Sequence, residues 1–235
     1  MSDKKAHKTE VDIIEKARGF WEVNNKKIIY IGSAVIILLL GWVIYKNMFK
    51  DPKEEKANNV VYVTQKYFSE FSNATDSNKI KLATFCINGD GMNPGALKII
   101  NEYSGTSAAN LCEYYAGACY LHLGQFAKAI DYLEKFDADG ATQIESRAYG
   151  MIADADAELN KKDDALSYYK KAAEVNTKDD YTSSEFLFKA ALYAQTNGKT
   201  KEAIDLFKKI KSDYPLTDKA ADVDRYLAKL GEFSE

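Results

Sequence analysis

Side chains that could act in acid–base or nucleophilic catalysis are scarce in this 235-residue chain. The two histidines, His7 and His122, have no cysteine or aspartate that the sequence places as a catalytic partner. Asp154 and Glu158 stand at helical spacing, which is typical of a solvated helix face. The glycine-rich segment 89–91 lacks the Gly-Lys-Ser/Thr that completes a phosphate-binding loop. We therefore predict that the protein is not an enzyme and holds no cofactor or metal.

The three cysteines, Cys86, Cys112 and Cys119, show no zinc-ligand spacing. On one helix, Cys112 and Cys119 would lie about 10 Å apart along the axis, too far for an easy disulfide. We expect all three to be small packing residues.

A different chemistry, non-covalent binding of polypeptide, is suggested by mixed aromatic, charged and amide side chains in three segments. These segments begin near residues 110, 146 and 184. The mixture suits an extended or helical peptide better than a phosphate or a terminal carboxylate, which would need several basic residues. The alternative is that these are ordinary solvated residues. The candidate groove residues are Tyr114, His122, Arg147, Asp154, Glu158, Glu185, Phe188 and Gln195.

The elements expected to position these residues are repeated helical hairpins. The small residues Ala129, Ala165 and Ala203 recur at spacings of 36 and 38 residues, where a small side chain lets two helices approach closely. Between the paired helices, tight turns are expected at Gly124, Asn160 and Gly198. This pattern resembles the tetratricopeptide repeat, a helix–turn–helix unit of about 34 residues. Stacking of such units would place the first helix of each on one concave surface.

Composition agrees with an all-α fold. The chain has only three prolines and few alternating strand patterns, and helix-favouring residues dominate. After residue 45 there are 25 basic and 30 acidic residues. This acidic balance argues against nucleic acid as a partner, because phosphates attract a basic surface.

Residues 28–45 form an uncharged apolar run between Lys26-Lys27 and Lys46. As a helix the run would extend about 27 Å, close to the hydrocarbon thickness of a bilayer. A buried core helix and a cleaved signal peptide are the alternatives. The charged flanks disfavour the first, and the segment 45–49 has no pair of small residues for cleavage. We predict an uncleaved transmembrane helix in contact with membrane lipid.

Orientation follows weakly from charge: five Lys/Arg residues precede the run within about 20 residues, and four follow it. We therefore expect an N-terminal cytoplasmic segment 1–27, a transmembrane helix 28–45 and a domain on the far side. Within that domain we expect a helical lead-in with a degenerate repeat at 53–109. The clear repeats and a C-terminal capping helix would occupy 110–235.

The order of these parts along the chain resembles that of a known protein family. The lead 19–27 with its aromatic pair, the Gly41-Trp42 near the far end of the span, and the repeats are similar to YfgM-like ancillary subunits of the bacterial Sec translocon. Segments 88–95 and 114–120 also resemble tetratricopeptide proteins of Bacteroidetes. The Lys-rich opening of the chain departs from the acidic start expected of the translocon family.

The resemblance implies a single-pass protein of the inner (cytoplasmic) membrane with its repeat domain in the periplasm. Its implied partners are the Sec translocon, a membrane-anchored periplasmic chaperone and secretory clients. Two functions are therefore compared: a membrane-anchored adaptor or chaperone that binds emerging proteins, and a structural scaffold that assembles an envelope complex without binding unfolded clients.

Overall fold

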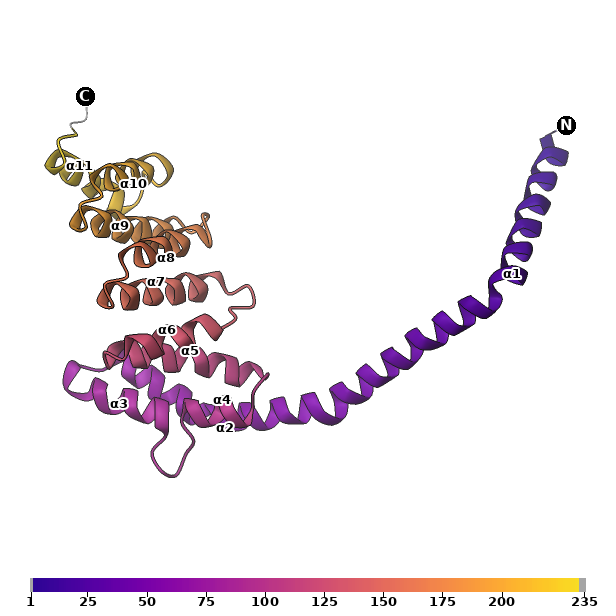
Figure 1. Cartoon of the computed structure of the whole chain (residues 1–235), viewed down its shortest axis with the longest axis horizontal. Coiled ribbons are helices and arrows are strands. Elements are labelled where there is room, and N and C mark those ends of the chain that lie inside the picture. Colours follow the sequence, from indigo (N-terminus) through magenta and orange to yellow (C-terminus); the bar gives the residue numbers. More distant parts are fainter. Residues whose placement is uncertain (1, 233–235) are drawn as a thin grey trace. The chain divides into compact units, whose positions relative to one another are not determined.

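The computed structural model describes the backbone of residues 2–232 and the side chains of residues 15, 16, 18–75 and 77–232. Every regular element in this part of the chain is helical, and one isolated bridge joins Gly89 to Pro94. The chain divides into two compact units, Met1–Lys53 and Glu54–Glu235. Figure 1 labels the helices. The expected all-α fold is confirmed.

The N-terminal unit contains α1 (Ser2–Tyr45) and a π-helical turn, η1 (Lys46–Lys50). It includes a segment long and apolar enough to cross a membrane, and 0% of its most apolar 18-residue window is buried. Within its own unit this window is therefore not packed in the way that the core helix of a soluble protein is. At the end of the apolar run, the Lys46 ammonium lies 5.7 Å from the centre of the Trp42 ring. Amphipathic and cationic side chains of this kind are typical of the headgroup level.

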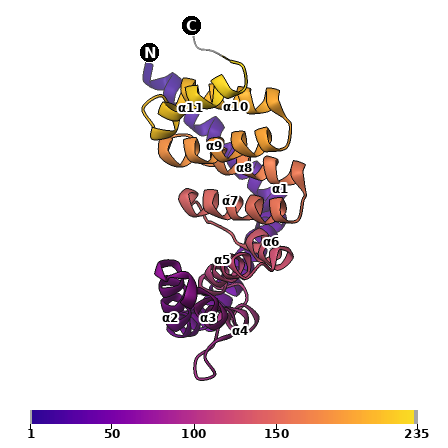
Figure 2. The same cartoon turned by 90° about the vertical axis from the view of Figure 1, so that its left-hand side faces the viewer.

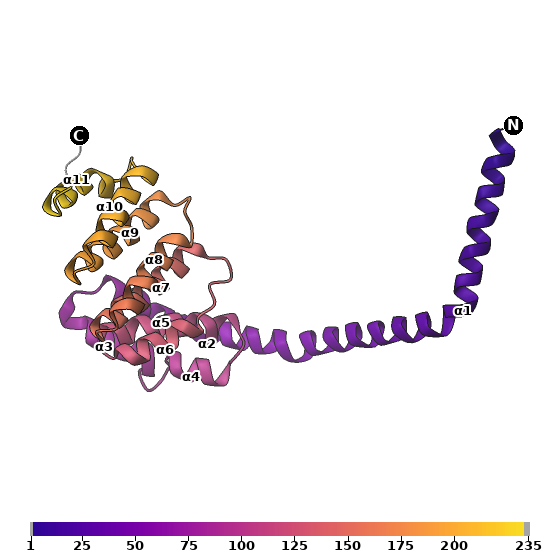
Figure 3. The ribbon, with the colours of Figure 1, turned by 45° about the horizontal axis from the view of Figure 1, so that its top comes forward.

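The C-terminal unit contains the remaining helices, and Figures 1 and 3 show the later ones lying against one another in chain order. The unit includes α2 (Asp51–Asn73) from Glu54 onward. The other helices are α3 (Asp76–Asn88), α4 (Ala96–Glu102), α5 (Ser107–His122), α6 (Phe126–Lys135), α7 (Thr142–Glu158), α8 (Lys162–Glu174), α9 (Asp180–Thr196), α10 (Thr200–Asp213) and α11 (Asp218–Lys229).

Three hairpins, α5–α6, α7–α8 and α9–α10, share one turn geometry. Gly124, Asn160 and Gly198 all have positive φ, as the expected tight turns require. In each turn the following amide donates 2.9 Å back into the preceding helix; for example, Lys161 N donates to the Asp156 carbonyl. This bond satisfies a carbonyl left free at the helix end. The turn residues predicted from the sequence are confirmed.

The small residues of the repeat lie where the helices touch. Ala129, Ala165 and Ala203 are all 0% exposed. Gly117 on α5 serves the same purpose, because a Cβ at this position would lie 2.5 Å from the Leu133 Cγ on α6. The two helices of a hairpin can therefore approach closely because the residues at their contact have small side chains or none.

We expect Ala165→Leu to lower the free energy of unfolding by about 1–3 kcal/mol, because the added carbons would overpack the α7–α8 contact. The neighbouring Lys162 is exposed, so Lys162→Ala should change stability by no more than about 0.5 kcal/mol. Chemical denaturation of both variants measures the difference. Equal effects would contradict the placement of Ala165 between the helices.

Helices α2, α3 and α4 cover the α5 side of the repeats and share one apolar cluster with α5. This cluster includes Cys86, Cys112 and Cys119, which are free thiols with 0% exposure, as expected of packing residues. The Glu54 carboxylate accepts from the Ser107 backbone amide at 3.0 Å, at the N-terminus of α5. Thr64 on α2 donates to the Pro94 carbonyl at 2.9 Å and so holds the loop between α3 and α4.

Candidate protein-binding site

The first helices of the three hairpins, α5, α7 and α9, line an open hollow of about 410 Å³. Figure 2 shows these helices within the stack. Four of the residues expected in a groove lie on its walls: Tyr114, Arg147, Asp154 and Glu185. We call this site the α5–α7–α9 hollow. Its full lining is Tyr114, Arg147, Gly150, Met151, Asp154, Tyr181, Thr182, Glu185, Phe186 and Lys189.

Tyr114 forms the α5 wall of the hollow. Its ring lies 5.2 Å from that of Phe136 and 5.9 Å from that of Phe68, measured between ring centres. Burial raises the pKa of Tyr114, and the nearby positive charge of Arg147 opposes that change. The hydroxyl is therefore neutral at physiological pH and can both donate and accept a hydrogen bond.

The α7 and α9 walls meet at Gly150 and Phe186. A Cβ on residue 150 would lie 2.2 Å from the Phe186 Cε1, so glycine makes room for this ring. The Lys189 ammonium lies 5.5 Å from the centre of the same ring, within the range of a cation–π contact. The lining of the hollow thus includes an aromatic ring with a cation over it.

One pair of charges in the hollow is already engaged. The Asp154 carboxylate accepts from the Tyr169 hydroxyl at 2.5 Å, and the Lys189 ammonium lies 3.9 Å from its other oxygen. Burial and this bond to Asp154 raise the pKa of Tyr169 far above the ordinary value, so the hydroxyl stays a donor. Asp154 therefore has a hydrogen-bond donor in Tyr169 and a nearby cation in Lys189 before any ligand arrives.

The structure corrects one predicted groove residue. Phe188 is only 8% exposed, and its ring packs 5.0 Å from that of Tyr226 and 5.7 Å from that of Phe207. Helix α11 packs on α9 at this position and covers a side chain that the repeat register places on the concave surface. Phe188 is a core residue.

Three further predicted residues lie outside the hollow. His122, in the last turn of α5, lies against the Phe71 ring with 5.3 Å between ring centres. Glu158 is exposed at the end of α7, and Gln195 is half-buried near the end of α9. The predicted set therefore divides between the hollow and more distant positions on the same helices.

The sequence-based set also omitted residues that the hollow contains. Tyr181 and Lys189 stand four residues on either side of Glu185, so all three share one stripe of α9. Met151 stands in the same relation to Arg147 on α7. Each of these three residues lies one helical turn from a predicted groove residue, so the helical spacing of four residues was the signal that could have identified them. Among the residues with described side chains, no cluster of three His, Cys, Asp or Glu could hold a metal ion.

Comparison with known families agrees with the three hairpins. Residues 112–138 and 185–217 match one family model described as tetratricopeptide repeat, and residues 146–179 match a second model of the same description. The chain contains tetratricopeptide repeats. Such repeats stack into extended concave surfaces used for protein–protein interaction. The α5–α7–α9 hollow is formed by the first helices of all three matched repeats. No match was found among curated proteins.

Proposed function

We propose that this protein is a non-enzymatic, membrane-anchored adaptor or chaperone that binds polypeptides through the α5–α7–α9 hollow. The hollow is the observation on which this proposal depends. It combines a half-buried tyrosine, an exposed tyrosine and both signs of charge on the first helices of three tetratricopeptide repeats. Tyrosine and arginine are the residue types that contribute most to binding energy when they are desolvated in an interface.

The charge of the hollow supports a polypeptide ligand over a phosphate or nucleic acid. Two cationic side chains, Arg147 and Lys189, are balanced by two anionic ones, Asp154 and Glu185. A phosphate site would concentrate positive charge, and the whole chain carries a net charge of −3. The hollow instead offers hydrogen bonds, aromatic surface and both charges, which suits the mixed surface of an extended protein segment.

The apolar N-terminal helix supports a place in the membrane, and we infer from the order of the chain's parts that this place is beside the Sec translocon in the inner membrane. Five Lys/Arg residues before the apolar run and four after it favour a cytoplasmic N-terminus. The lead, the span and the repeats follow the order found in ancillary translocon subunits. In this arrangement the repeats lie in the periplasm, where they meet secretory proteins as they emerge and cooperate with a membrane-anchored chaperone.

Tyr181 provides the sharpest test of the binding site. Its side chain is 67% exposed on the wall of the hollow, so its removal leaves the core intact. With the full-length protein in lipid nanodiscs and reduced, carboxymethylated α-lactalbumin as an unfolded probe, we expect Tyr181→Ala to weaken binding about thirtyfold. This corresponds to about 2 kcal/mol for an aromatic side chain removed from an interface.

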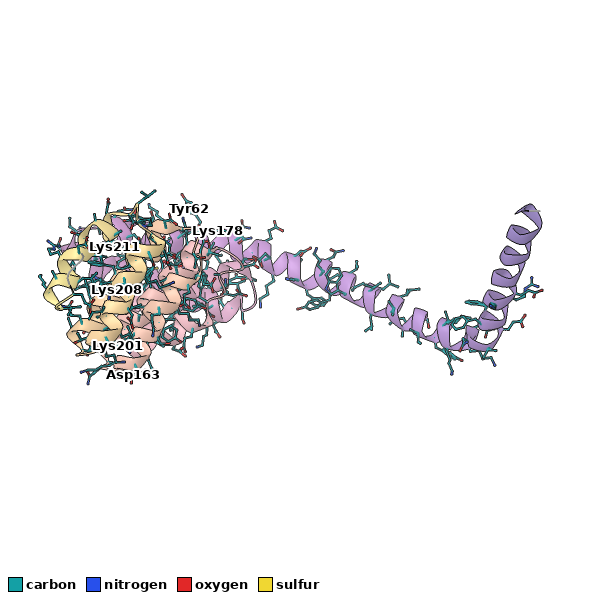
Figure 4. The ribbon with its side chains drawn as sticks, turned by 90° about the horizontal axis from the view of Figure 1, so that it is seen from above. Tyr62, Asp163, Lys178, Lys201, Lys208 and Lys211 are labelled. Atoms are coloured by element: carbon teal, nitrogen blue, oxygen red, sulfur yellow. The ribbon has the colours of Figure 1, made fainter. Side chains whose placement is uncertain are left out.

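Tyr62 supplies the matched control. It is 69% exposed on α2, away from the hollow, and is labelled in Figure 4. Tyr62→Ala should bind the probe as the wild type does. If the wild type does not bind the unfolded probe, the chaperone function is wrong. A photocrosslinker at residue 181 that captures only folded envelope components in native membranes would instead support the structural scaffold.

A further inference from the structure

Two of the four charged residues in the α5–α7–α9 hollow have no ionic partner in the described part of the chain. Asp154 and Lys189 pair with each other, and Asp154 also binds Tyr169. Arg147 and Glu185 line the same hollow, yet neither forms an ion pair or side-chain hydrogen bond with a described residue. The hollow therefore presents one available cation and one available anion.

These two charges occupy equivalent positions in successive repeats. Arg147 and Glu185 are each the sixth residue of their helices, α7 and α9. Stacked helices are typically about 8–10 Å apart. The distance between the two helix axes is therefore close to the roughly 7 Å between alternate residues of an extended polypeptide. Alternate side chains of such a segment lie on the same side of it. Long side chains on both partners can bridge the small difference.

We propose that the hollow selects extended polypeptide segments in which one acidic and one basic side chain stand two residues apart. The acidic side chain pairs with Arg147 and the basic side chain with Glu185. This inference depends on the proposed function, because it assigns the chemistry of the segments that the hollow binds.

The arrangement also rejects other segments. A segment with two acidic side chains would place like charge against Glu185 and Asp154, and one with two basic side chains would oppose Arg147 and Lys189. Like charges placed together at an interface are a common source of discrimination. The selection therefore has an attractive and a repulsive part.

The test uses five blocked, fluorescent peptides that differ only at two positions separated by one residue. Two of them carry Glu and Lys, one in each order, and the other three carry two Gln, two Glu, or two Lys. With the full-length protein in nanodiscs at low salt, the Glu/Lys peptide in one of its two orders should bind about tenfold more tightly than the Gln/Gln peptide. The Glu/Glu and Lys/Lys peptides should bind less tightly than the Gln/Gln peptide.

Charge-reversal variants distinguish a change in peptide preference from a loss of binding that results from misfolding. Arg147→Glu should transfer the preference to the Lys/Lys peptide, and Glu185→Lys should transfer it to the Glu/Glu peptide. A gain of binding of this kind does not result from misfolding. Lys201→Glu is the control, since it makes the same change of charge at an exposed position on α10, outside the hollow, labelled in Figure 4.

Three results would overturn the proposal in distinguishable ways. If Lys201→Glu changes the preference as much as Arg147→Glu does, net charge selects the peptides. If all five peptides bind equally and Tyr181→Ala weakens the binding of each, the hollow is the binding site but its charges do not select the peptides. If neither the peptides nor the unfolded probe binds to the wild type, the proposed function fails as well.

Discussion

In spheroplasts of a Gram-negative host, a membrane-impermeant maleimide is expected to label Lys201→Cys and to leave Lys16→Cys unlabelled. Lys201 lies on α10 of the repeat unit, and Lys16 precedes the apolar run. The expected result is all or none, because the bilayer core excludes the charged reagent. It follows from the excess of positive residues on the N-terminal side of the apolar run and from the periplasmic location that we propose for the repeats.

The native cysteines do not interfere with this measurement. Cys86, Cys112 and Cys119 are 0% exposed, so the folded wild-type protein should give no signal. After lysis with the fold intact, both introduced cysteines should react, which shows that each is accessible. Labelling of Lys16→Cys alone in spheroplasts would reverse the orientation and place the hollow in the cytoplasm.

Replacing Phe188 by alanine is expected to lower the free energy of unfolding by about 3–5 kcal/mol, the usual cost of removing a buried aromatic side chain. Phe188 contacts both Phe207 on α10 and Tyr226 on α11, so the cavity would loosen the C-terminal end of the repeat stack. Denaturant unfolding followed by circular dichroism measures this decrease.

Tyr181 lies on the same helix, but its replacement should affect ligand binding and leave stability almost unchanged. Tyr181→Ala should change stability by no more than about 0.5 kcal/mol while weakening ligand binding. Phe188→Ala should reduce stability first, and binding only as the protein unfolds. If Phe188→Ala unfolds at the wild-type midpoint, α11 does not cover this side chain, and Phe188 belongs to the groove.

The repeat architecture could be predicted because its signals are local. Ala129, Ala165 and Ala203 recur at nearly constant spacing, and each hairpin turn needs a residue that tolerates positive φ. Both requirements come from backbone geometry and from contacts within one helical hairpin. The apolar helix could be predicted from the sequence as well, since its length and lack of charge are properties of contiguous residues.

Part of the candidate site was predictable for the same reason. Repeat register places Arg147 and Glu185 on the first helices of successive hairpins, and both line the hollow. Tyr181 was missed because it lies in the first turn of α9, ahead of the repeat unit that begins near Ser184. The boundaries of a repeat unit do not coincide with those of the surface it presents.

The sequence by itself determined that this chain is a set of stacked helical hairpins that follows an apolar helix. Only the tertiary structure decided which side chains remain available for binding. Helix α11 buries Phe188. The Asp154 carboxylate accepts a hydrogen bond from Tyr169 and lies near the Lys189 ammonium. No described neighbour forms an ion pair with Arg147 or Glu185. The physical reason is that helix formation depends on neighbours within a few residues. The availability of a charge or a ring depends on contacts with helices that are distant in sequence.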